Sequence, residues 1–472
     1  MYTTLRLTAL AAALTCAASP AGAEDLMQIY DQARQADPTF AIADASRLVA
    51  EGGADAARAA LLPQISASLN YLHSDGNSRT VGPLINQDTG LPATDAAGNA
   101  IFESTQSISR DRSRQAQGQV SQSLFNWSNI ERWRSARATR ESVGSDYDAA
   151  AQELIVRTAT AYFAVLTAED QLAFAQANEK ALARQLDQAE QRYQVGLSAI
   201  TDVHEARANH DTARAQVITA QNNVDNLREA ISQITGKNFG ELKKLREQLP
   251  LEKPEPPELE SWVDTALKQS PQIASRAHAL DAARLNVEAQ RGGHYPTLSA
   301  SLVRSDTPAW GNSTRIAGTD AFGPFHANSL NGDTTFGVTL AVPIFTGGLV
   351  HAQVHTAIGQ REIAQDQEEL TRRSVVAGTR NAYRAVIAGI SEVEATKQAV
   401  VSAQSALDAT QAGFEVGTRT IVDVLLSQQQ LFQAQSQYSQ ARHQFVLSGL
   451  QLKQAAGVVA AKDLEGVNAL LE

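Results

Sequence analysis

The stretch Tyr193-Gln-Val-Gly-Leu-Ser-Ala-Ile-Thr-Asp-Val203 recurs 221 residues later as Phe414-Glu-Val-Gly-Thr-Arg-Thr-Ile-Val-Asp-Val424. Each copy places a Val-Gly pair between long proline-free segments that are rich in Ala, Gln and Leu, and such segments are compatible with helix. Glycine tolerates the positive φ that a tight turn between helices favours. We therefore predict two helical hairpins, formed by helices at 129–194 and 199–235 and at 349–414 and 420–456.

A second repeat consists of segments in which apolar and polar residues alternate. Pro63-Gln-Ile-Ser-Ala-Ser-Leu69 recurs as Pro296-Thr-Leu-Ser-Ala-Ser-Leu302. We predict four strands in two pairs, at about 62–74, 114–126, 295–304 and 334–345. An apolar face opposite a polar face over about ten residues is typical of a strand in the outer membrane, although a half-buried soluble sheet has the same alternation.

The two repeats divide the chain into five segments. Arg6, the small and apolar run from Leu7 to Ala18 and the sequence Ala21-Gly22-Ala23 have the pattern of a cleaved export signal. The predicted segments are a signal peptide at 1–23, a first structural repeat at 24–236, an insertion at 237–258, a second structural repeat at 259–456 and a C-terminal tail at 457–472.

Composition excludes several classes of function. The chain has 472 residues and a formal charge of −11, which opposes a nucleic-acid-binding role. Its single cysteine excludes a disulfide framework. His351 and His355 have the i, i+4 spacing of a two-histidine metal face, but no third ligand accompanies them. Since neither a P-loop nor a Gly-x-Ser-x-Gly motif is present, we expect no enzyme, no cofactor and no metal.

Four strands in one chain require partners if they cross a membrane. About eight strands is the practical minimum for a closed barrel, and open strand edges are not tolerated in lipid. Three copies of the chain would supply twelve strands. The alternative is a periplasmic or secreted coiled-coil protein, a scaffold or adhesin with a small soluble sheet. Such a protein would not need to trimerise.

Several motifs together resemble the TolC branch of the outer-membrane efflux protein family. They are the two Val-Gly turns, each followed by Ile-x-Asp-Val, and the stretches Asp25–Arg34, Gln233–Gly236 and Lys397–Gln404. The resemblance covers almost the whole mature chain. It implies an α+β membrane protein: a homotrimeric twelve-stranded outer-membrane β-barrel with four strands per chain, continuous with a long α-helical periplasmic barrel. It also implies a mixed equatorial domain, to which the 237–258 insertion and the 457–472 tail would belong.

The same resemblance implies the function of an exit duct in the outer membrane of a Gram-negative bacterium. The duct would serve tripartite efflux pumps, type I protein secretion or both, and would conduct drugs, small molecules or polypeptides passively. The implied partners are a periplasmic adaptor protein, an inner-membrane transporter of the RND, ABC or MFS type, and outer-membrane lipid.

The resemblance assigns adaptor contact to the tips of the two hairpins, although a turn with a purely structural role explains their glycines equally well. The tip residues are Val195, Gly196, Leu197, Val416, Gly417 and Thr418.

The resemblance also implies a gate at the periplasmic end. Asp202 and Arg419 match the aspartate and arginine of a latch, so an ion pair between them is expected. Phe414 stands where the family has a tyrosine, and it cannot donate a hydrogen bond. The two lumen aspartates of the family fall on Asp423 and Leu426, which leaves one ring of carboxylates. Repulsion among the three carboxylates should raise the apparent pKa of the ring, and their negative charge should favour cations in the lumen. The alternative role for Asp423 is a helix N-cap.

Overall fold

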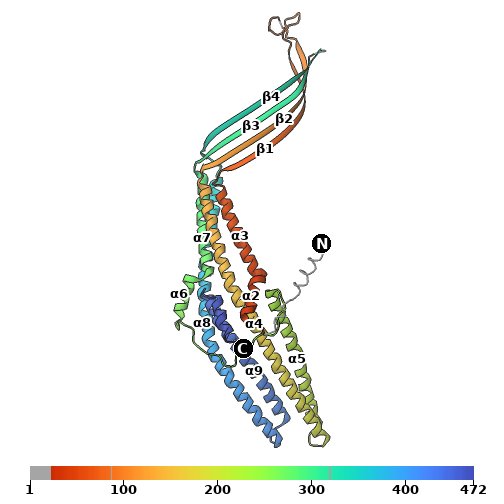
Figure 1. The fold of residues 1–472 in the computed structure, drawn as a ribbon, viewed down its shortest axis with the longest axis vertical. Coiled ribbons are helices and arrows are strands. Elements are labelled where there is room, and N and C mark those ends of the chain that lie inside the picture. The colour runs from red at the N-terminus through yellow and green to blue at the C-terminus, as the bar shows by residue number, and fades with distance from the viewer. Residues whose placement is uncertain (1–22, 87, 318–319) are drawn as a thin grey trace, which may run out of the picture. The chain divides into compact units, whose positions relative to one another are not determined.

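The computed structural model describes residues 23–86, 88–317 and 320–472 (Figure 1). The predicted signal peptide at 1–23 lies outside these residues except for its last position. The elements in chain order are α2 Leu26–Ala36, α3 Pro38–Ala59, β1 Gln64–Pro83, β2 Phe102–Phe125, α4 Trp127–Gln194, α5 Ile200–Thr235, α6 Leu259–Gln269, α7 Pro271–Arg291, a 3-10 turn at Gly292–His294, β3 Thr297–Ala317, β4 Asp320–Ala341, α8 Leu349–Glu415, α9 Ile421–Ala455 and α10 Ala461–Asn468.

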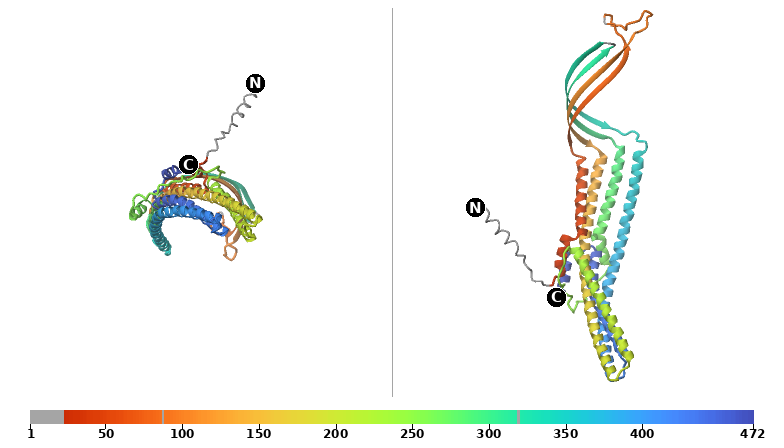
Figure 2. Two further views of the ribbon diagram at one scale, coloured as in Figure 1. Left: turned by 90° about the horizontal axis from the view of Figure 1, so that it is seen from below. Right: turned by 90° about the vertical axis from the view of Figure 1, so that its right-hand side faces the viewer.

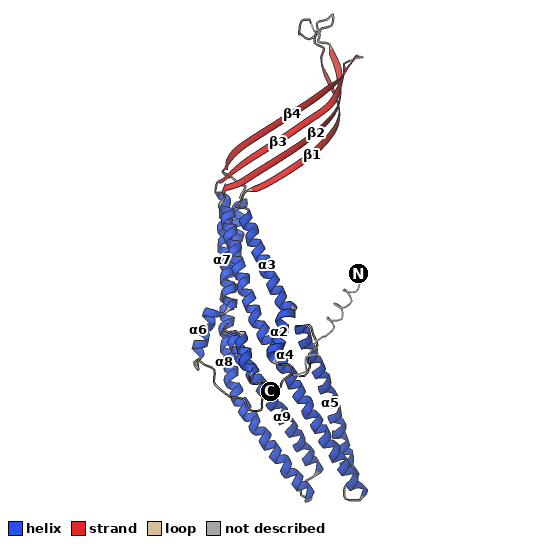
Figure 3. Cartoon of the chain, viewed as in Figure 1, coloured by secondary structure: helices blue, strands red, loops and turns tan. Residues whose placement is uncertain are grey.

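The chain forms two compact units. One contains the described residues 23–50, 138–280 and 362–472, and the other contains 51–137 and 281–361. The second unit holds all four strands, drawn in red in Figure 3, with the helix ends that adjoin them. The first unit holds the α4–α5 and α8–α9 hairpin ends.

The sheet is an antiparallel meander in the order β1-β2-β3-β4. The β1–β2 ladder runs without interruption from the pair Gln64↔Ser121 to the pair Pro83↔Phe102. The β2–β3 and β3–β4 ladders each contain one register shift, at Ser123/Phe125 and at Ser313/Arg315. Because β-bulges increase local twist, these shifts contribute to the curvature and twist of the sheet in Figure 2.

The four strands are longer than the sequence predicted. They contain 20, 24, 21 and 22 residues, whereas the predicted segments span 10 to 13 residues. Strand pairing continues through 75–83, 102–113, 305–317 and 320–333, which lie outside the predicted segments. The prediction was wrong there because backbone pairing continues where both faces of a sheet are polar, and the apolar alternation then carries no signal.

Both outer strands of the sheet have an unpaired edge. Within the described chain, β1 pairs only with β2, and β4 pairs only with β3. Large apolar side chains on these strands are exposed, among them Ile65 at 79%, Leu69 at 69% and Phe336 at 70%. An edge that is this long and this apolar is a template for pairing with another chain.

The helical unit is built around one main apolar cluster. Leu26 and Ile29 of α2 pack with Phe163 of α4, Leu450 of α9 and Leu464 of α10. Tyr162 is also fully buried here, and its hydroxyl donates to the Lys243 carbonyl at 2.8 Å. Burial raises the pKa of the Tyr162 phenol. The cluster therefore joins α4 and α9, which belong to different hairpins.

Short β-bridges attach the 237–258 insertion and the 457–472 tail to the helical unit. Glu24 pairs in parallel with Leu242, and Leu245 pairs in antiparallel fashion with Leu471. Lys244 and Glu472 exchange backbone hydrogen bonds of 3.1 and 2.9 Å. Three segments that are far apart in sequence thus meet beside α4.

The hairpin helices begin and end within two residues of the positions predicted for them. Of the helices in the part of the chain that the structure describes, none has the length and hydropathy needed to cross a bilayer.

His443 of α9 is a buried polar group in the helical unit. Its side chain lies against Phe163, with ring centroids 5.6 Å apart, and the residue is 3% exposed. Nδ1 lies 2.8 Å from the Thr167 hydroxyl, which donates its proton to the Phe163 carbonyl at 2.7 Å. The hydroxyl is then the acceptor for His443, which fixes a neutral ring protonated on Nδ1. Burial lowers the pKa of His443 to about 4, against an opposing effect of Asp170.

We predict that this unit loses stability in acid because of His443. The unfolded chain binds a proton near pH 6.5 and the folded chain only near pH 4, so the stability falls as the pH drops through that window. The full difference between the folded-state and unfolded-state pKa of His443 corresponds to about 3 kcal/mol of unfolding free energy. The fall in Tm between pH 7.5 and pH 5, followed by circular dichroism, should be smaller in His443→Gln than in the wild type. His278→Gln is the matched control, because His278 is 38% exposed beside Glu141. Equal acid sensitivity in all three proteins would contradict the prediction.

Candidate functional site: the ends of the two helical hairpins

The turn between α4 and α5 is a Schellman motif. Gly196 has φ +78°, the left-handed conformation that favours glycine. Its N–H donates to the Tyr193 carbonyl at 3.0 Å, and the Leu197 N–H donates to the Arg192 carbonyl at 2.8 Å. These bonds satisfy the last carbonyl groups of α4 and reverse the chain within a few residues.

The turn between α8 and α9 repeats this geometry. Gly417 also has φ +78°. Its N–H donates to the Phe414 carbonyl at 3.1 Å, and the Thr418 N–H donates to the Gly413 carbonyl at 2.8 Å. The Thr418 hydroxyl adds a bond of 3.0 Å to the same Gly413 carbonyl. The local sequence therefore accounts for both turns without any partner molecule.

The apolar side chains at the tips are not explained by the turns themselves. Val195 is 69% exposed, Leu197 71% and Val416 75%. An apolar residue at the Leu197 position of a Schellman motif commonly packs back on its own helix, yet here the side chain faces solvent. The tips thus present an exposed apolar surface at the end of each hairpin.

Asp423 closes the first turn of α9. Thr420 is the N-cap residue, and its side chain accepts from the Asp423 N–H at 3.3 Å. The Asp423 carboxylate accepts from the Thr420 N–H at 3.0 Å and from its hydroxyl at 2.9 Å. These bonds, led by the backbone one, lower the pKa of Asp423, and Arg419 adds to the effect. Asp423 therefore occupies the N3 position of a capping box. The alternative interpretation expected it at the N-cap position, which Thr420 occupies.

Asp202 and Arg419 do not form an ion pair within the described residues of one chain. The Asp202 carboxylate instead accepts a 2.6 Å bond from the Ser198 hydroxyl and a 3.4 Å bond from the Thr201 hydroxyl. Arg419 is exposed, and its backbone N–H donates to the Gly413 carbonyl at 3.2 Å.

Phe414 joins the two hairpins. The guanidinium carbon of Arg192, from the end of α4, lies 4.8 Å from the centre of the Phe414 ring. The ring also packs against the cluster formed by Leu182, Ala213, Ile421 and Leu425. This cluster draws on α4, α5 and α9, so Phe414 of α8 completes a contact among four helices. A cation–π contact requires only an aromatic ring. Phe414 can therefore form it, although it lacks the hydroxyl of the tyrosine that the resemblance led us to expect.

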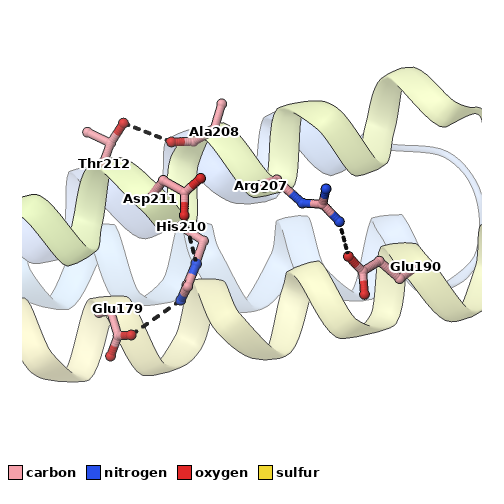
Figure 4. A network of polar contacts seen from close by, with 7 residues as sticks. All are labelled: Glu179, Glu190, Arg207, Ala208, His210, Asp211 and Thr212. Carbon is pink, nitrogen blue, oxygen red and sulfur yellow. Dashed lines mark hydrogen bonds and ion pairs between the residues drawn. The ribbon is translucent and has the colours of Figure 1, made fainter.

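Polar contacts brace the first hairpin along its length (Figure 4). His210 lies between two carboxylates, with Nε2 3.3 Å from Glu179 and Nδ1 3.6 Å from Asp211. Closer to the turn, Arg207 donates to Glu190 at 2.6 Å. Because the contacts to Glu179 and Glu190 join α5 to α4, the tip is carried on a hairpin of fixed register.

Some contributing residues had a signal in the sequence and others had none. Thr420-x-x-Asp423 is readable as a capping box. Arg192 had no comparable signal, because its partner Phe414 belongs to the other hairpin, whereas the Ser198–Asp202 bond is local and spans four residues. Among the described residues no group of three or more His, Cys, Asp or Glu side chains is placed to hold a metal ion.

Comparisons with known proteins agree along most of the chain. The sequence profile of the family described as "Outer membrane efflux protein" matches residues 29–237 and 262–458. Outer membrane protein TolC of Escherichia coli (strain K12) is 38% identical over 452 residues, which cover 94% of this chain and 85% of that protein. Alkaline protease secretion protein AprF of Pseudomonas aeruginosa is 27% identical over 354 residues, covering 74% and 71%. The solved structure of outer membrane protein VceC from Vibrio cholerae shares the fold, with a TM-score of 0.68 at 19% identity over 92% of this chain and 96% of that one.

The capping box at the start of α9 predicts a local effect of Thr420→Ala. Loss of an N-cap hydroxyl costs about 1 kcal/mol, which corresponds to roughly fivefold faster opening of the first turn. Hydrogen–deuterium exchange of a peptide spanning 418–430 should accelerate by that factor. Thr420→Ser should retain the slow exchange. Thr396→Ala, which removes a hydroxyl that bonds only within α8, should leave this peptide unchanged. Unaltered exchange in Thr420→Ala would contradict the capping role.

Proposed function

Because the chain belongs to the outer membrane efflux protein family, we propose that it works as an exit duct in the outer membrane of a Gram-negative bacterium. Cargo would pass through it passively, across the periplasm and out of the cell. The observation that carries this function is the four-stranded sheet, which has an apolar face and two edges that are unpaired within the described residues. The family is one of transport proteins, and we expect no catalytic activity.

Three copies of the chain satisfy the demands of this sheet. Each copy would pair its β1 edge with the β4 edge of the next, which gives a closed barrel of twelve strands. Closure removes every edge, as a lipid environment requires. A scaffold or adhesin in water has no comparable need for closure, so the sheet favours the duct over that alternative.

The relatives suggest two kinds of traffic. AprF is named for secretion of an alkaline protease, and the family itself is named for efflux. This chain would accordingly serve tripartite efflux, type I protein secretion or both. It would receive cargo from an inner-membrane transporter of the RND, ABC or MFS type through a periplasmic adaptor.

The adaptor would bind at the hairpin tips. Val195, Leu197 and Val416 are exposed there, and the turn geometry does not require apolar side chains at these positions. An apolar contact from the adaptor would bury them. Gly196 and Gly417 contribute by making both turns tight, and the Thr418 hydroxyl reinforces the second turn.

The gate would be formed between neighbouring chains. Arg419 is exposed and could pair with Asp202 of the next copy, which would complete the latch that one chain does not form. Three Asp423 carboxylates would make a ring in the lumen. Within one chain the capping box lowers the pKa of Asp423, whereas repulsion in a ring raises it. The capping bonds thus favour the ionised ring, which attracts cations at neutral pH.

The duct function predicts a trimer in the outer membrane and transport that depends on the tips. Envelope fractionation of the native host, followed by mass determination in mild detergent, should give an outer-membrane species three times the mature chain mass.

In a host that lacks the chain, Val416→Asp should fail to restore drug resistance while still forming the trimer. Leu91→Asp, at an exposed position between β1 and β2, should restore it. A soluble monomer would overturn the function itself, and full rescue by Val416→Asp would overturn the tip contact.

The carboxylate ring predicts cation selectivity. In planar bilayers under a salt gradient, Asp423→Asn should reduce the cation-to-anion permeability ratio by roughly threefold, because the negative potential in the lumen is lost. Asp408→Asn removes an equal charge from an exposed site on α8 and should leave the reversal potential unchanged. An unchanged reversal potential in Asp423→Asn would remove the gate role.

A further inference from the structure

Charged side chains on β2 are segregated by face. Arg110, Arg112 and Arg114 occupy alternate positions and therefore project from the same side of the sheet. All three are exposed; on the opposite side the neighbours at 109, 113 and 115 are partly buried, and Asp111 is exposed. This difference in exposure agrees with the curvature of the sheet in Figure 2, in which one face is concave.

The arginines share a face with the apolar residues of the same strand. Ala116, Gly118, Val120 and Leu124 continue the alternation of Arg110–Arg114 toward the end of β2 that leads into α4. The ladder places Ala67 opposite Gly118 and Leu302 opposite Val120, so the apolar face extends across β1 and β3. This is the face that meets lipid in the proposed function.

The arginines begin where the apolar face ends. From Leu124 to Ala116 the strand rises roughly 27 Å at about 3.4 Å per residue. At a tilt of about 40° this is roughly 21 Å of membrane thickness, close to the apolar band of about 25 Å on such barrels. Arg114, Arg112 and Arg110 lie beyond it, toward the β1–β2 connection and away from α4. That position corresponds to the headgroups of the outer leaflet.

Two aromatic residues mark the same level. Tyr71 lies opposite Arg114 in the β1–β2 ladder, and Trp310 lies opposite Arg112 in the β2–β3 ladder. Their ring centroids are 6.5 Å apart, across the β2 strand that carries the arginines. Tyr and Trp are enriched at the boundary between the hydrocarbon and the headgroups.

Two of the three guanidinium groups have no acidic partner among the residues that the structure describes. Arg110 has an ion pair of 3.6 Å with Asp75, which also lies 3.4 Å from His73. No ion pair to Arg112 or Arg114 occurs within the described part of the chain, and both residues are exposed. Because β2 is an inner strand of the sheet, a neighbouring copy that pairs with β1 or β4 does not cover them. These two cations are therefore accessible to an anionic group from outside the protein.

We propose that this belt, defined as Arg110, Arg112, Arg114, Tyr71 and Trp310, binds the phosphate-bearing headgroup of a glycolipid in the outer leaflet. Guanidinium groups bind phosphate oxygens in bidentate fashion, and the two aromatic rings at the same level are typical of the boundary between hydrocarbon and headgroups. The lipid is favoured over free phosphate because the belt is continuous with the apolar face, so acyl chains and phosphates are bound together. This inference rests on the proposed function, since it requires the sheet to lie in the outer membrane.

The test is binding of a fluorescent diphosphoryl lipid A to the full-length trimer in mild detergent. Arg112→Gln should weaken binding about fivefold, and Arg110→Gln/Arg112→Gln/Arg114→Gln should weaken it by tenfold or more. Arg315→Gln is the matched control, because the register places Arg315 on the opposite face beside Ser107. It should change affinity less than twofold. If the glutamine triple fails to form a trimer, the triple Arg→Lys variant is measured in its place. It keeps the charge and should retain most of the binding.

Each result of this experiment bears on the lipid. Equal affinity in the wild type and the glutamine triple would overturn the inference, as would an equal loss in Arg315→Gln. Undiminished binding of a dephosphorylated glycolipid would also overturn it. Full displacement by millimolar inorganic phosphate would make the belt a site for free phosphate and not for lipid. Trimer mass and channel conductance are measured on the same wild-type sample. A conducting trimer without lipid preference would remove this inference alone, whereas a soluble monomer would remove the duct as well.

Discussion

The structure depends on the hydrogen bonds that one chain leaves unmade at the two edges of its sheet. β1 and β4 each contain at least twenty residues, and the outer edge of each carries a row of backbone donors and acceptors without a partner in the described chain. In lipid each such group costs several kcal/mol. Other copies of the chain are the most direct source of matching edges. The oligomer is therefore a condition for this sheet to exist in a membrane, and the shared lumen follows from it.

The internal repeat preserves backbone geometry more closely than chemistry. Gly196 and Gly417 have the same φ, and each turn uses the same two hydrogen bonds. The aspartates that follow differ in their partners: Ser198 binds Asp202, while Thr420 forms a capping box with Asp423. In the proposed gate, two hairpins with the same backbone would thus take different roles, one contributing to the latch between chains and the other placing a charge.

The sequence predicted some parts of the fold and of the candidate site better than others, depending on the physical origin of the signal. The hairpin helices were placed within two residues because glycine and proline limit where a helix can end. The strands were predicted too short, since alternation identifies only the part of a strand that has one apolar face. The capping of Asp423 was legible in Thr420-x-x-Asp423. The Arg192–Phe414 contact was not, because residues 222 positions apart meet only through tertiary packing. His443 was missed for the same reason, as its burial depends on Phe163 from another helix.

The capping box has a mechanical consequence for the duct. Asp423 is bonded to Thr420, four residues beyond the exposed Val416, so the carboxylate and the tip belong to one short rigid segment. A partner that grips the tip would carry this charge along with it, and no separate relay between contact and lumen would be needed. In three copies such movement would widen or narrow the triangle of carboxylates much as the blades of an iris set its aperture. One displacement of the tip would then accompany docking and also change the electrostatic barrier to ions.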